Sequence, residues 1–246
     1  MGGAYFLLDE SPLEAEIQKI LGVPAKIAVA QEKLELFELS PLEKETYSSY
    51  KGTRLKSWLI GRKALKQLLR KLNEPDDTSG LKFPNPHFSL THTQDTAIAA
   101  GVLREQSCFY SGIDGLNGQE RISILGIGVD LEIKRRISFD SSRFFLTENE
   151  KKWVSQFDSK TQEQELLRLW TIKEALYKSH LENKKTHLFH YTLKNPGHSS
   201  GEAFLFPRDR FNDKPVSFKY VSFQVPLGFF SFSFSYHHKQ AYSAEI

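Results

Sequence analysis

Two acidic residues lie two positions apart within an apolar stretch of the sequence. Asp130 and Glu132 alternate there with Val129 and Leu131, inside a segment, 122–133, whose composition predicts a β-strand. Because successive side chains of a strand point to opposite faces, both carboxylates would leave one face while their neighbours point into a core. Mg²⁺ is typically held by one or two carboxylates together with phosphates and waters. The spacing therefore predicts either a magnesium site or the solvated face of a half-exposed strand.

A carboxylate and an ammonium group share one face of a predicted helix later in the chain. Apolar periodicity predicts this helix over residues 163–181, and Trp170, Glu174 and Lys178 follow one another at intervals of four. The tryptophan indicates that the face is at least partly covered, and a covered carboxylate needs a metal ion or a cation nearby. Glu174 is therefore a candidate third metal ligand. The alternative is an exposed Glu174 and Lys178 pair, worth about 0.3 to 0.5 kcal/mol.

An imidazole and a guanidinium group occupy two further positions where an anion could bind. His92 follows a predicted strand, 88–91, and precedes a turn, so its ring can project toward a ligand. Arg62 lies on the apolar side of a predicted helix over 55–72. The functional interpretation gives each an anionic partner. The alternative is a structural histidine and an arginine whose stem is buried while its charged end reaches solvent.

Capping and breaker patterns predict the elements that would position these residues. An N-cap serine, a first-turn proline and a capping-box glutamate indicate two helix starts, with Ser11, Pro12 and Glu14 at the first and Ser40, Pro41 and Glu43 at the second. Breaker residues over 73–80 would end the helix that contains Arg62. The alternating segment 88–91 and the small, apolar segment 96–103 then predict a β-hairpin.

The second half of the chain carries its own loop, cap and strand signals. A polar, glycine-rich stretch, 111–119, predicts a surface loop, and we divide the chain near it into an N-terminal half, 1–120, and a C-terminal half, 121–246. Thr147 and Glu150 would cap another helix. Aromatic residues alternate with serines over 230–236, which predicts a half-buried strand with one aromatic face. Because strands and helices do not alternate repeatedly, the predicted fold class is α+β.

Composition excludes several classes of protein. The chain has 246 residues, of which 39% are hydrophobic and 26% charged, as expected of a folded globular protein. A net charge of +3 is too small to define a nucleic-acid-binding surface. Cys108 is the only cysteine, so no intramolecular disulfide can form, and a reducing compartment is expected. The N-terminus has no signal-peptide pattern, and no apolar stretch reaches the ~18 residues needed to span a bilayer. We therefore expect a soluble, cytoplasmic protein.

Together these motifs resemble the 4'-phosphopantetheinyl transferases, in particular the larger, two-halved type that activates carrier proteins. Residues 128–132 match the family's Gly-x-Asp-x-Glu strand, and residues 170–178 match its Trp-Thr-x-Lys-Glu-Ala helix with the lysine that follows. Residues 88–93 are similar to its Phe-Asn-Leu-Ser-His-Ser segment, with serine in place of asparagine and threonine in place of both serines. Weaker similarities lie in the Phe144, Phe145 and Glu150 group and in the basic Arg54, Gly61 and Arg62 helix. The family's Gly-Lys-Pro motif is interrupted here, over 80–84.

The resemblance implies a fold, a reaction and a set of roles. The fold would be an α+β pseudo-dimer of two similar halves, with coenzyme A in the cleft between them. The phosphopantetheine arm of coenzyme A would be transferred to a serine of an acyl, polyketide or peptidyl carrier protein, with Mg²⁺ as cofactor. The implied metal ligands are Asp130, Glu132 and Glu174; the implied catalytic residues are Glu174 as base, Lys178 and His92; the implied coenzyme-binding residues are Arg54, Arg62, Lys44, Lys56, His92 and Lys173. The protein would act as a monomer, without a nucleic-acid or membrane partner.

Two other functions are compatible with parts of the sequence. A different Mg²⁺-dependent phosphohydrolase could use the same acidic strand, and it would release its product without a protein acceptor. A nucleic-acid-binding module could use the basic residues between positions 44 and 63, namely Lys44, Lys51, Arg54, Lys56, Arg62 and Lys63. The second alternative leaves the three carboxylates unexplained, because acidic groups repel a phosphate backbone. The sequence does not identify the carrier protein, its pathway, or a preference for coenzyme A over acyl-coenzyme A.

Overall fold

The computed structural model describes residues 9–93, 95–103, 109–111, 119–205, 215–226 and 228–238. Within these ranges the strands form two antiparallel sheets. The smaller sheet has the order β1-β3-β2 and the larger the order β4-β5-β9-β8-β7-β6. The strands are β1 (Lys26–Ala30), β2 (Phe88–His92), β3 (Ala97–Gly101), β4 (Phe109–Ser111), β5 (Gln119–Ile133), β6 (Tyr191–Leu193), β7 (Ser200–Leu205), β8 (Val216–Val225) and β9 (Gly228–His238).

Helices precede, separate and follow these strands, so the predicted α+β class is confirmed. The α-helices are α1 (Glu10–Leu21), α2 (Pro41–Ser49), α3 (Gly52–Lys71), α4 (Glu148–Val154) and α5 (Ser159–Ser179). Short 3₁₀ segments are η1 (Leu36–Glu38), η2 (Phe139–Phe144), η3 (Asn183–Lys185) and η4 (Leu188–His190). None of the helices in the described ranges combines the length and the apolar character that crossing a bilayer requires.

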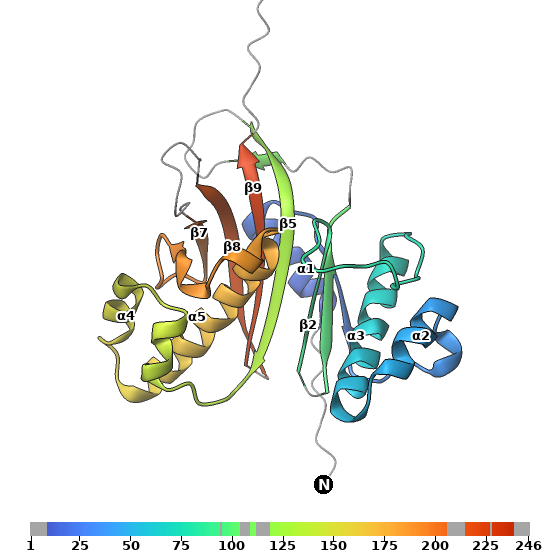
Figure 1. Cartoon of the computed structure of the whole chain (residues 1–246). Helices are drawn as coiled ribbons and strands as arrows, with labels where there is room; N and C mark the ends of the chain where they lie inside the picture. The colour runs from blue at the N-terminus through green and yellow to red at the C-terminus, as the bar shows by residue number, and fades with distance from the viewer. Residues whose placement is uncertain are drawn as a thin grey trace, which may run out of the picture.

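The elements stack in four layers (Figure 1). Helix α3 covers one face of the smaller sheet, where leucines such as Leu65 and Leu68 meet the alanines of β1 and β3. The opposite face of that sheet packs on the larger sheet through a shared core that includes Ile98, Val129 and Phe232. Helix α5 then covers the outer face of the larger sheet, over β5 and β9. Strand β5 therefore has the smaller sheet on one side and α5 on the other.

Side-chain hydroxyls of β2 bind the backbone of β5 where the two sheets meet. The Val129 N–H donates to Ser89 Oγ at 3.0 Å, and the Leu131 N–H donates to Thr91 Oγ1 at 3.2 Å. The two strands are thus joined by side chains and not by a β-ladder. Position 91 has threonine where the similar motif has serine, and threonine keeps the hydroxyl group that this contact needs. The arrangement fixes the end of β2, with His92, beside the acidic part of β5.

The backbone of α5 approaches β5 closely at a glycine. A Cβ atom placed on Gly128 would lie 1.9 Å from the carbonyl oxygen of Ala175, so only glycine allows this approach. Because Ala175 follows Glu174 and lies one turn before Lys178, the close packing brings the polar face of α5 over Asp130. The glycine of the Gly-x-Asp-x-Glu motif therefore positions the helix relative to the carboxylates.

Several predicted boundaries are confirmed and others are corrected. The Ser40 and Glu43 capping box and the Thr147 and Glu150 capping box are both present, and β2 pairs with β3 as predicted. The first helix is capped by Asp9 instead of Ser11, because the Asp9 carboxylate accepts from the Ser11 N–H. Helix α5 begins four residues earlier than predicted, at Ser159, where Asp158 caps it.

The strand predicted as half-buried is buried on both faces. Strand β9 lies between β5 and β8, and its aromatic side chains enter the core between the sheets. Its serines are also buried, and Ser235 Oγ donates to the carbonyl of Ser179, where α5 ends. Residues 112–118 of the predicted loop lie outside the described residues, while Ser111 and Gln119 belong to strands. The division at 120/121 stays a prediction, and it falls within β5.

Candidate active site

A cavity of about 550 Å³ opens where β2, β5 and α5 meet. The smaller sheet contributes the end of β2 and the residue after it, and the larger sheet and α5 contribute the remainder. The lining residues are Leu90, Thr91, His92, Thr93, Asp130, Leu131, Glu132, Ile133, Arg135, Trp170, Glu174 and Lys178. The three carboxylates singled out in the sequence, together with His92 and Lys178, therefore line one cavity.

Asp130 is the most buried of the three carboxylates, at 4% exposure. Its Oδ1 accepts hydrogen bonds from Lys178 Nζ at 2.7 Å and from Thr91 Oγ1 at 3.1 Å. Its Oδ2 is buried and has no hydrogen-bond partner in the described part of the chain. Leaving a buried carboxylate oxygen without a partner costs free energy, so Oδ2 indicates a missing ligand.

Glu132 also lines the cavity and has two hydrogen-bond partners. Its Oε1 accepts from Trp170 Nε1 at 3.0 Å and from Arg135 at 3.1 Å. The Arg135 guanidinium also lies over the Trp170 ring, 5.7 Å from its centroid. Burial, followed by the negative charge of Asp130, raises the pKa of Glu132. A cation that replaced lost solvation would stabilise this carboxylate in its ionised form.

Glu174 projects from α5 into the same cavity. Burial has the largest influence and raises the pKa of Glu174; Lys178 opposes it, and Asp130 and Glu132 add to it. Among the described residues, no three acidic, histidine or cysteine side chains lie close enough together to coordinate one metal ion as they stand. Instead, Asp130 forms an ion pair with Lys178, and Glu132 forms one with Arg135. The unpartnered Oδ2 and the two raised pKa values nevertheless fit a divalent cation.

A second cavity, of about 280 Å³, adjoins the first. It is lined by Leu90 and His92, which also line the first cavity, and by residues at and around the start of α3: Tyr50, Thr53, Arg54, Ser57, Trp58, Gly61 and Arg62. His92 is exposed at the end of β2, but partial desolvation of its ring, followed by the positive charge of Lys178, lowers its pKa below the ordinary histidine value, which favours the neutral form near pH 7. Leu90 and His92 thus lie between a cavity lined by the carboxylates and a cavity lined by two arginines.

The arginines of the second cavity lie against aromatic rings. Arg54 stacks over Tyr50 at 4.6 Å from the ring centroid, and Arg62 lies over Trp58 at 5.2 Å. Burial lowers the pKa of Arg62, although three nearby groups oppose this effect. The Trp58 Nε1 is buried and has no hydrogen-bond partner in the ranges described. These are features of a partly desolvated cationic surface that can bind an anion.

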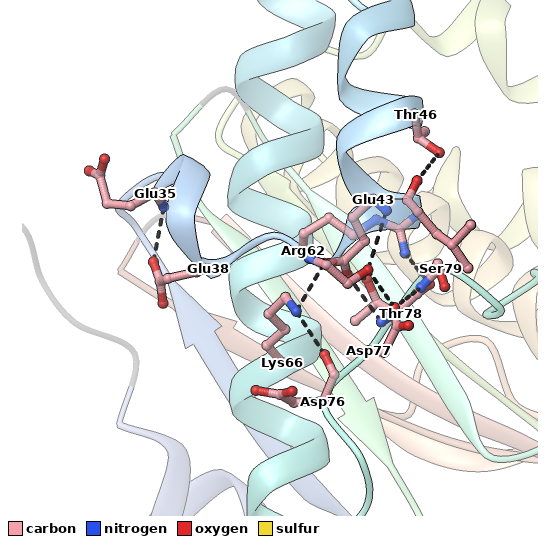
Figure 2. A network of polar contacts seen from close by, with 12 residues as sticks. Glu35, Glu38, Glu43, Thr46, Arg62, Lys66, Asp76, Asp77, Thr78 and Ser79 are labelled. Carbon is pink, nitrogen blue, oxygen red and sulfur yellow. Dashed lines mark hydrogen bonds and ion pairs between the residues drawn. The ribbon is translucent and has the colours of Figure 1, made fainter.

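A polar network beneath α3 fixes the position of Arg62 (Figure 2). Arg62 Nη1 donates to the carbonyl of Thr78 at 2.8 Å, and the Thr78 N–H donates to Glu43 at 3.1 Å. Lys66 forms a buried ion pair with Glu43 at 3.0 Å and donates to the Asp76 carbonyl at 2.9 Å. Arg62 is therefore held by the segment that follows α3, and the interpretation of its charge as merely reaching solvent is too simple.

Three residues predicted to contact the coenzyme lie elsewhere. Lys44 is exposed on α2, and Lys56 forms an exposed ion pair with Asp95; neither lines the two cavities. Lys173 is fully buried, forms an ion pair with Glu150 at 2.7 Å and also donates to the Tyr191 carbonyl. The ammonium group of Lys173 therefore joins α5 to α4 and β6 and lines neither cavity.

Two other motif residues, Glu150 and Phe145, are buried and contact the elements that carry the cavity residues. Glu150 accepts from the Thr147 N–H at 2.8 Å and from the Leu193 N–H at 3.0 Å, so the capping glutamate is also the partner of Lys173. Phe145 is buried with its ring edge-on to Trp170, whereas Phe144 is 61% exposed. The phenylalanine pair therefore has one structural and one surface member.

Arg135 is a charged residue of the first cavity that the sequence interpretation did not consider. It lies in a run of three basic residues, 134–136, directly after the acidic strand. A basic residue that follows a candidate metal ligand by three positions can fold back onto it, and this signal was available in the sequence. Its neighbour Arg136 instead forms an exposed pair with Glu163.

These features define a class of protein: one whose cavity combines clustered carboxylates with a neighbouring cationic surface, as a transferase of phosphate-linked groups requires. Residues 126–213 match the family model ACPS, the 4'-phosphopantetheinyl transferase superfamily. This confirms the resemblance and supports a transferase that acts in phosphopantetheine transfer. No curated protein matches the chain. The matched segment includes β5 from Gly126 and all of α5, whereas β2 and α3 lie outside it.

Proposed function

We propose that this protein transfers the 4'-phosphopantetheine arm of coenzyme A to a serine hydroxyl of an apo carrier protein, with Mg²⁺, and releases adenosine 3',5'-bisphosphate. The observation that carries the proposal is the buried, unpartnered Oδ2 of Asp130, in a cavity that Glu132 and Glu174 also line, beside a second cavity that shares His92 and contains Arg54 and Arg62. The first cavity suits a metal-bound diphosphate, and the second suits the phosphate of a nucleotide.

The ligands divide between the two cavities in this proposal. Asp130, Glu132 and Glu174 would hold Mg²⁺, which would neutralise the diphosphate of coenzyme A and so reduce its repulsion of a nucleophile. Arg54 and Arg62 would bind the adenosine-side phosphate groups, and neutral His92 would hydrogen-bond a phosphate oxygen. The first cavity is lined by residues from both sheets, which supports a cleft between two halves as the coenzyme site.

The transfer step uses a base and a cation on the same helix. The serine oxygen of the carrier protein forms a bond to the phosphorus that bears the pantetheine arm, while the bond from that phosphorus to the bridging oxygen breaks. Glu174 accepts the serine proton, and its raised pKa makes it a stronger base than an exposed glutamate. Lys178 stabilises the negative charge on the departing adenosine bisphosphate. Because a carboxylate that holds a metal ion is less free to accept a proton, metal binding is the first role proposed for Glu174 and base catalysis the second.

A transfer assay tests the proposal directly. The protein is incubated with Mg²⁺, coenzyme A and a panel of apo carrier proteins from fatty-acid, polyketide and peptide synthesis, and intact masses are recorded. We expect one carrier or more to gain a single phosphopantetheine group, together with stoichiometric adenosine bisphosphate. Release of phosphopantetheine or phosphate without a protein acceptor would instead identify a phosphohydrolase. Sedimentation and cell fractionation would test the proposed monomeric and cytoplasmic states.

A further inference from the structure

The negative charge of the acidic cavity is largely balanced by two cationic side chains, Lys178 and Arg135. Both are more exposed to solvent than Lys66 and Lys173, the cations of two buried ion pairs. Three carboxylates, on Asp130, Glu132 and Glu174, line the cavity together with Lys178 and Arg135, so a single negative charge is left over when all five are ionised. Lys178 binds Asp130 and Arg135 binds Glu132. Lys178 lies on Asp130 Oδ1 and Arg135 on Glu132 Oε1, so each cation is next to, and repels, a divalent cation that would bind these carboxylates through Asp130 Oδ2.

We propose that Lys178 and Arg135 are exchangeable counter-cations. In the free protein they neutralise Asp130 and Glu132; when a divalent cation binds to the carboxylates, they leave them and bind the diphosphate of coenzyme A. The proposal rests on the proposed function and adds to it a route by which metal and coenzyme binding are coupled. It also assigns Arg135 to the coenzyme-binding residues.

The surroundings of both side chains allow this movement. Lys178 is 28% exposed, and among the described residues its ammonium pairs with one carboxylate, through Asp130 Oδ1. Arg135 is 50% exposed, lies just after the end of β5, and besides Glu132 contacts only the open face of the Trp170 ring in the part of the chain described. Lys173, five residues before Lys178 on α5, provides the contrast. Its ammonium is fully buried and bound to both oxygens of Glu150 and to a carbonyl. A long side chain with one partner and access to solvent can turn, whereas one fixed on all sides cannot.

The charges in the cavity explain why binding of the metal ion and binding of coenzyme A should favour each other. A divalent cation that replaced Lys178 and Arg135 would neutralise the carboxylates. Both side-chain cations would then lie next to the metal ion without a negatively charged partner. A diphosphate that enters the cavity supplies the negative charge that these cations need. Each ligand thus makes the binding of the other more favourable, and linkage requires the effect to be reciprocal.

Metal titration of the free protein provides the test, with a readout other than activity. Mn²⁺ is titrated into the wild type and into Lys178→Met, without coenzyme, at a pH of about 8 where carboxylates are ionised, and free Mn²⁺ is measured by paramagnetic resonance. We expect Lys178→Met to bind Mn²⁺ about tenfold more tightly, because the competing charge is gone. Lys194→Met is the matched control, since that lysine also pairs with a glutamate but lies away from the cavity.

Arg135 is tested with its neighbour as control. Arg135→Gln is expected to tighten Mn²⁺ binding by about threefold, less than Lys178→Met because Arg135 is more exposed and its charge is better screened. Arg136→Gln, which removes an exposed arginine that pairs with Glu163, should leave the affinity unchanged. If Lys178→Met does not fold, judged from its thermal transition, the Arg135 and Arg136 comparison decides.

The coupling between ligands is measured in the same titration. Saturating coenzyme A should tighten Mn²⁺ binding to the wild type, and this factor should fall at least threefold in Lys178→Met. Unchanged or weaker Mn²⁺ binding by Lys178→Met and Arg135→Gln, while the wild type binds Mn²⁺ and transfers phosphopantetheine, would overturn the exchange alone. A wild type that neither binds Mn²⁺ nor modifies any carrier would instead overturn the proposed function.

Discussion

Two buried polar clusters in this protein contain the same residue types but differ in how completely their carboxylates are satisfied. Glu43 accepts from Thr78, from the Ser40 N–H at 2.8 Å and from Lys66 at 3.0 Å. Burial alone would raise the pKa of Glu43, but these hydrogen bonds together lower it. In the acidic cavity, by contrast, Asp130 keeps one oxygen without a partner, and burial raises the pKa of Glu174. A saturated cluster stabilises the fold, and an unsaturated one is available for a ligand.

The strongest test of this contrast is Asp130→Asn. The change removes the charge at the unpartnered oxygen, so transfer should fall by about 10³-fold or more if the carboxylate holds the metal. The free energy of unfolding should change by no more than about 1 to 2 kcal/mol, because the amide can keep the Thr91 contact. Single-turnover labelling of a carrier protein measures the first quantity and urea unfolding the second. Transfer at wild-type rates would remove Asp130 from the active site.

The saturated cluster predicts the opposite outcome for Glu43→Gln. This variant leaves the Lys66 ammonium buried without its counter-ion, so the free energy of unfolding should fall by about 3 to 5 kcal/mol. Glu202→Gln is a suitable control, since Glu202 pairs with Lys194 at the surface and should contribute well under about 1 kcal/mol. Urea unfolding followed by circular dichroism gives both values. Equal stability losses in the two variants would show that the contrast between buried and exposed pairs does not hold.

Arg62 belongs to the Glu43 cluster and also lines the second cavity, so its substitution should have an intermediate effect. Arg62→Ala removes a guanidinium that is held by the Thr78 carbonyl and lines the second cavity. We expect the apparent KM for coenzyme A to rise about tenfold, equivalent to about 1.4 kcal/mol, and the KM for the carrier to stay nearly unchanged. Steady-state assays that vary each substrate in turn distinguish these constants. A variant that loses stability and keeps its KM for coenzyme A would assign Arg62 to the fold only.

The pH dependence of stability should show the smallest effect. Because the folded-state pKa of Glu43 lies below its unfolded value, its contribution is fully present above about pH 4.3 and is lost as the pH falls through the folded pKa. The difference in unfolding free energy between wild type and Glu43→Gln should therefore stay constant between about pH 5 and 7 and shrink below about pH 4. Urea unfolding at a series of pH values measures it, and a difference that grew on acidification would contradict the sign.

Much of the site could be predicted from local periodicity. The two-residue spacing of Asp130 and Glu132 on a strand, and the four-residue spacing of Glu174 and Lys178 on a helix, place each pair on one face whatever the tertiary structure. The burial of the serine face of β9, opposite Phe232 and the other aromatic residues, could not be predicted in the same way. Two flanking strands and α5 bury the serine face of β9 as well, and a sequence that alternates aromatic and hydroxyl residues gives no sign of these neighbours.

The partners of individual charges were the least predictable part. Lys173 and Lys178 are both one turn or less from Glu174, yet one is fully buried against Glu150 and the other reaches Asp130 across the cavity. Their roles depend on which side of α5 packs against β6 and α4. The ion pair between Glu43 and Lys66 likewise joins two helices, and nothing in either helix alone indicates it.

The hydroxyl contacts from β2 to β5 also bear on how the protein behaves in a crowded solution. A strand edge with free N–H groups can pair with an edge of another molecule and so start aggregation. On β5 the N–H groups of Val129 and Leu131 are already bound by Ser89 and Thr91. These two side chains, of which Thr91 also lines the cavity, thus deny this edge to other chains. The acidic strand can remain accessible to small ligands without offering a template for intermolecular sheets.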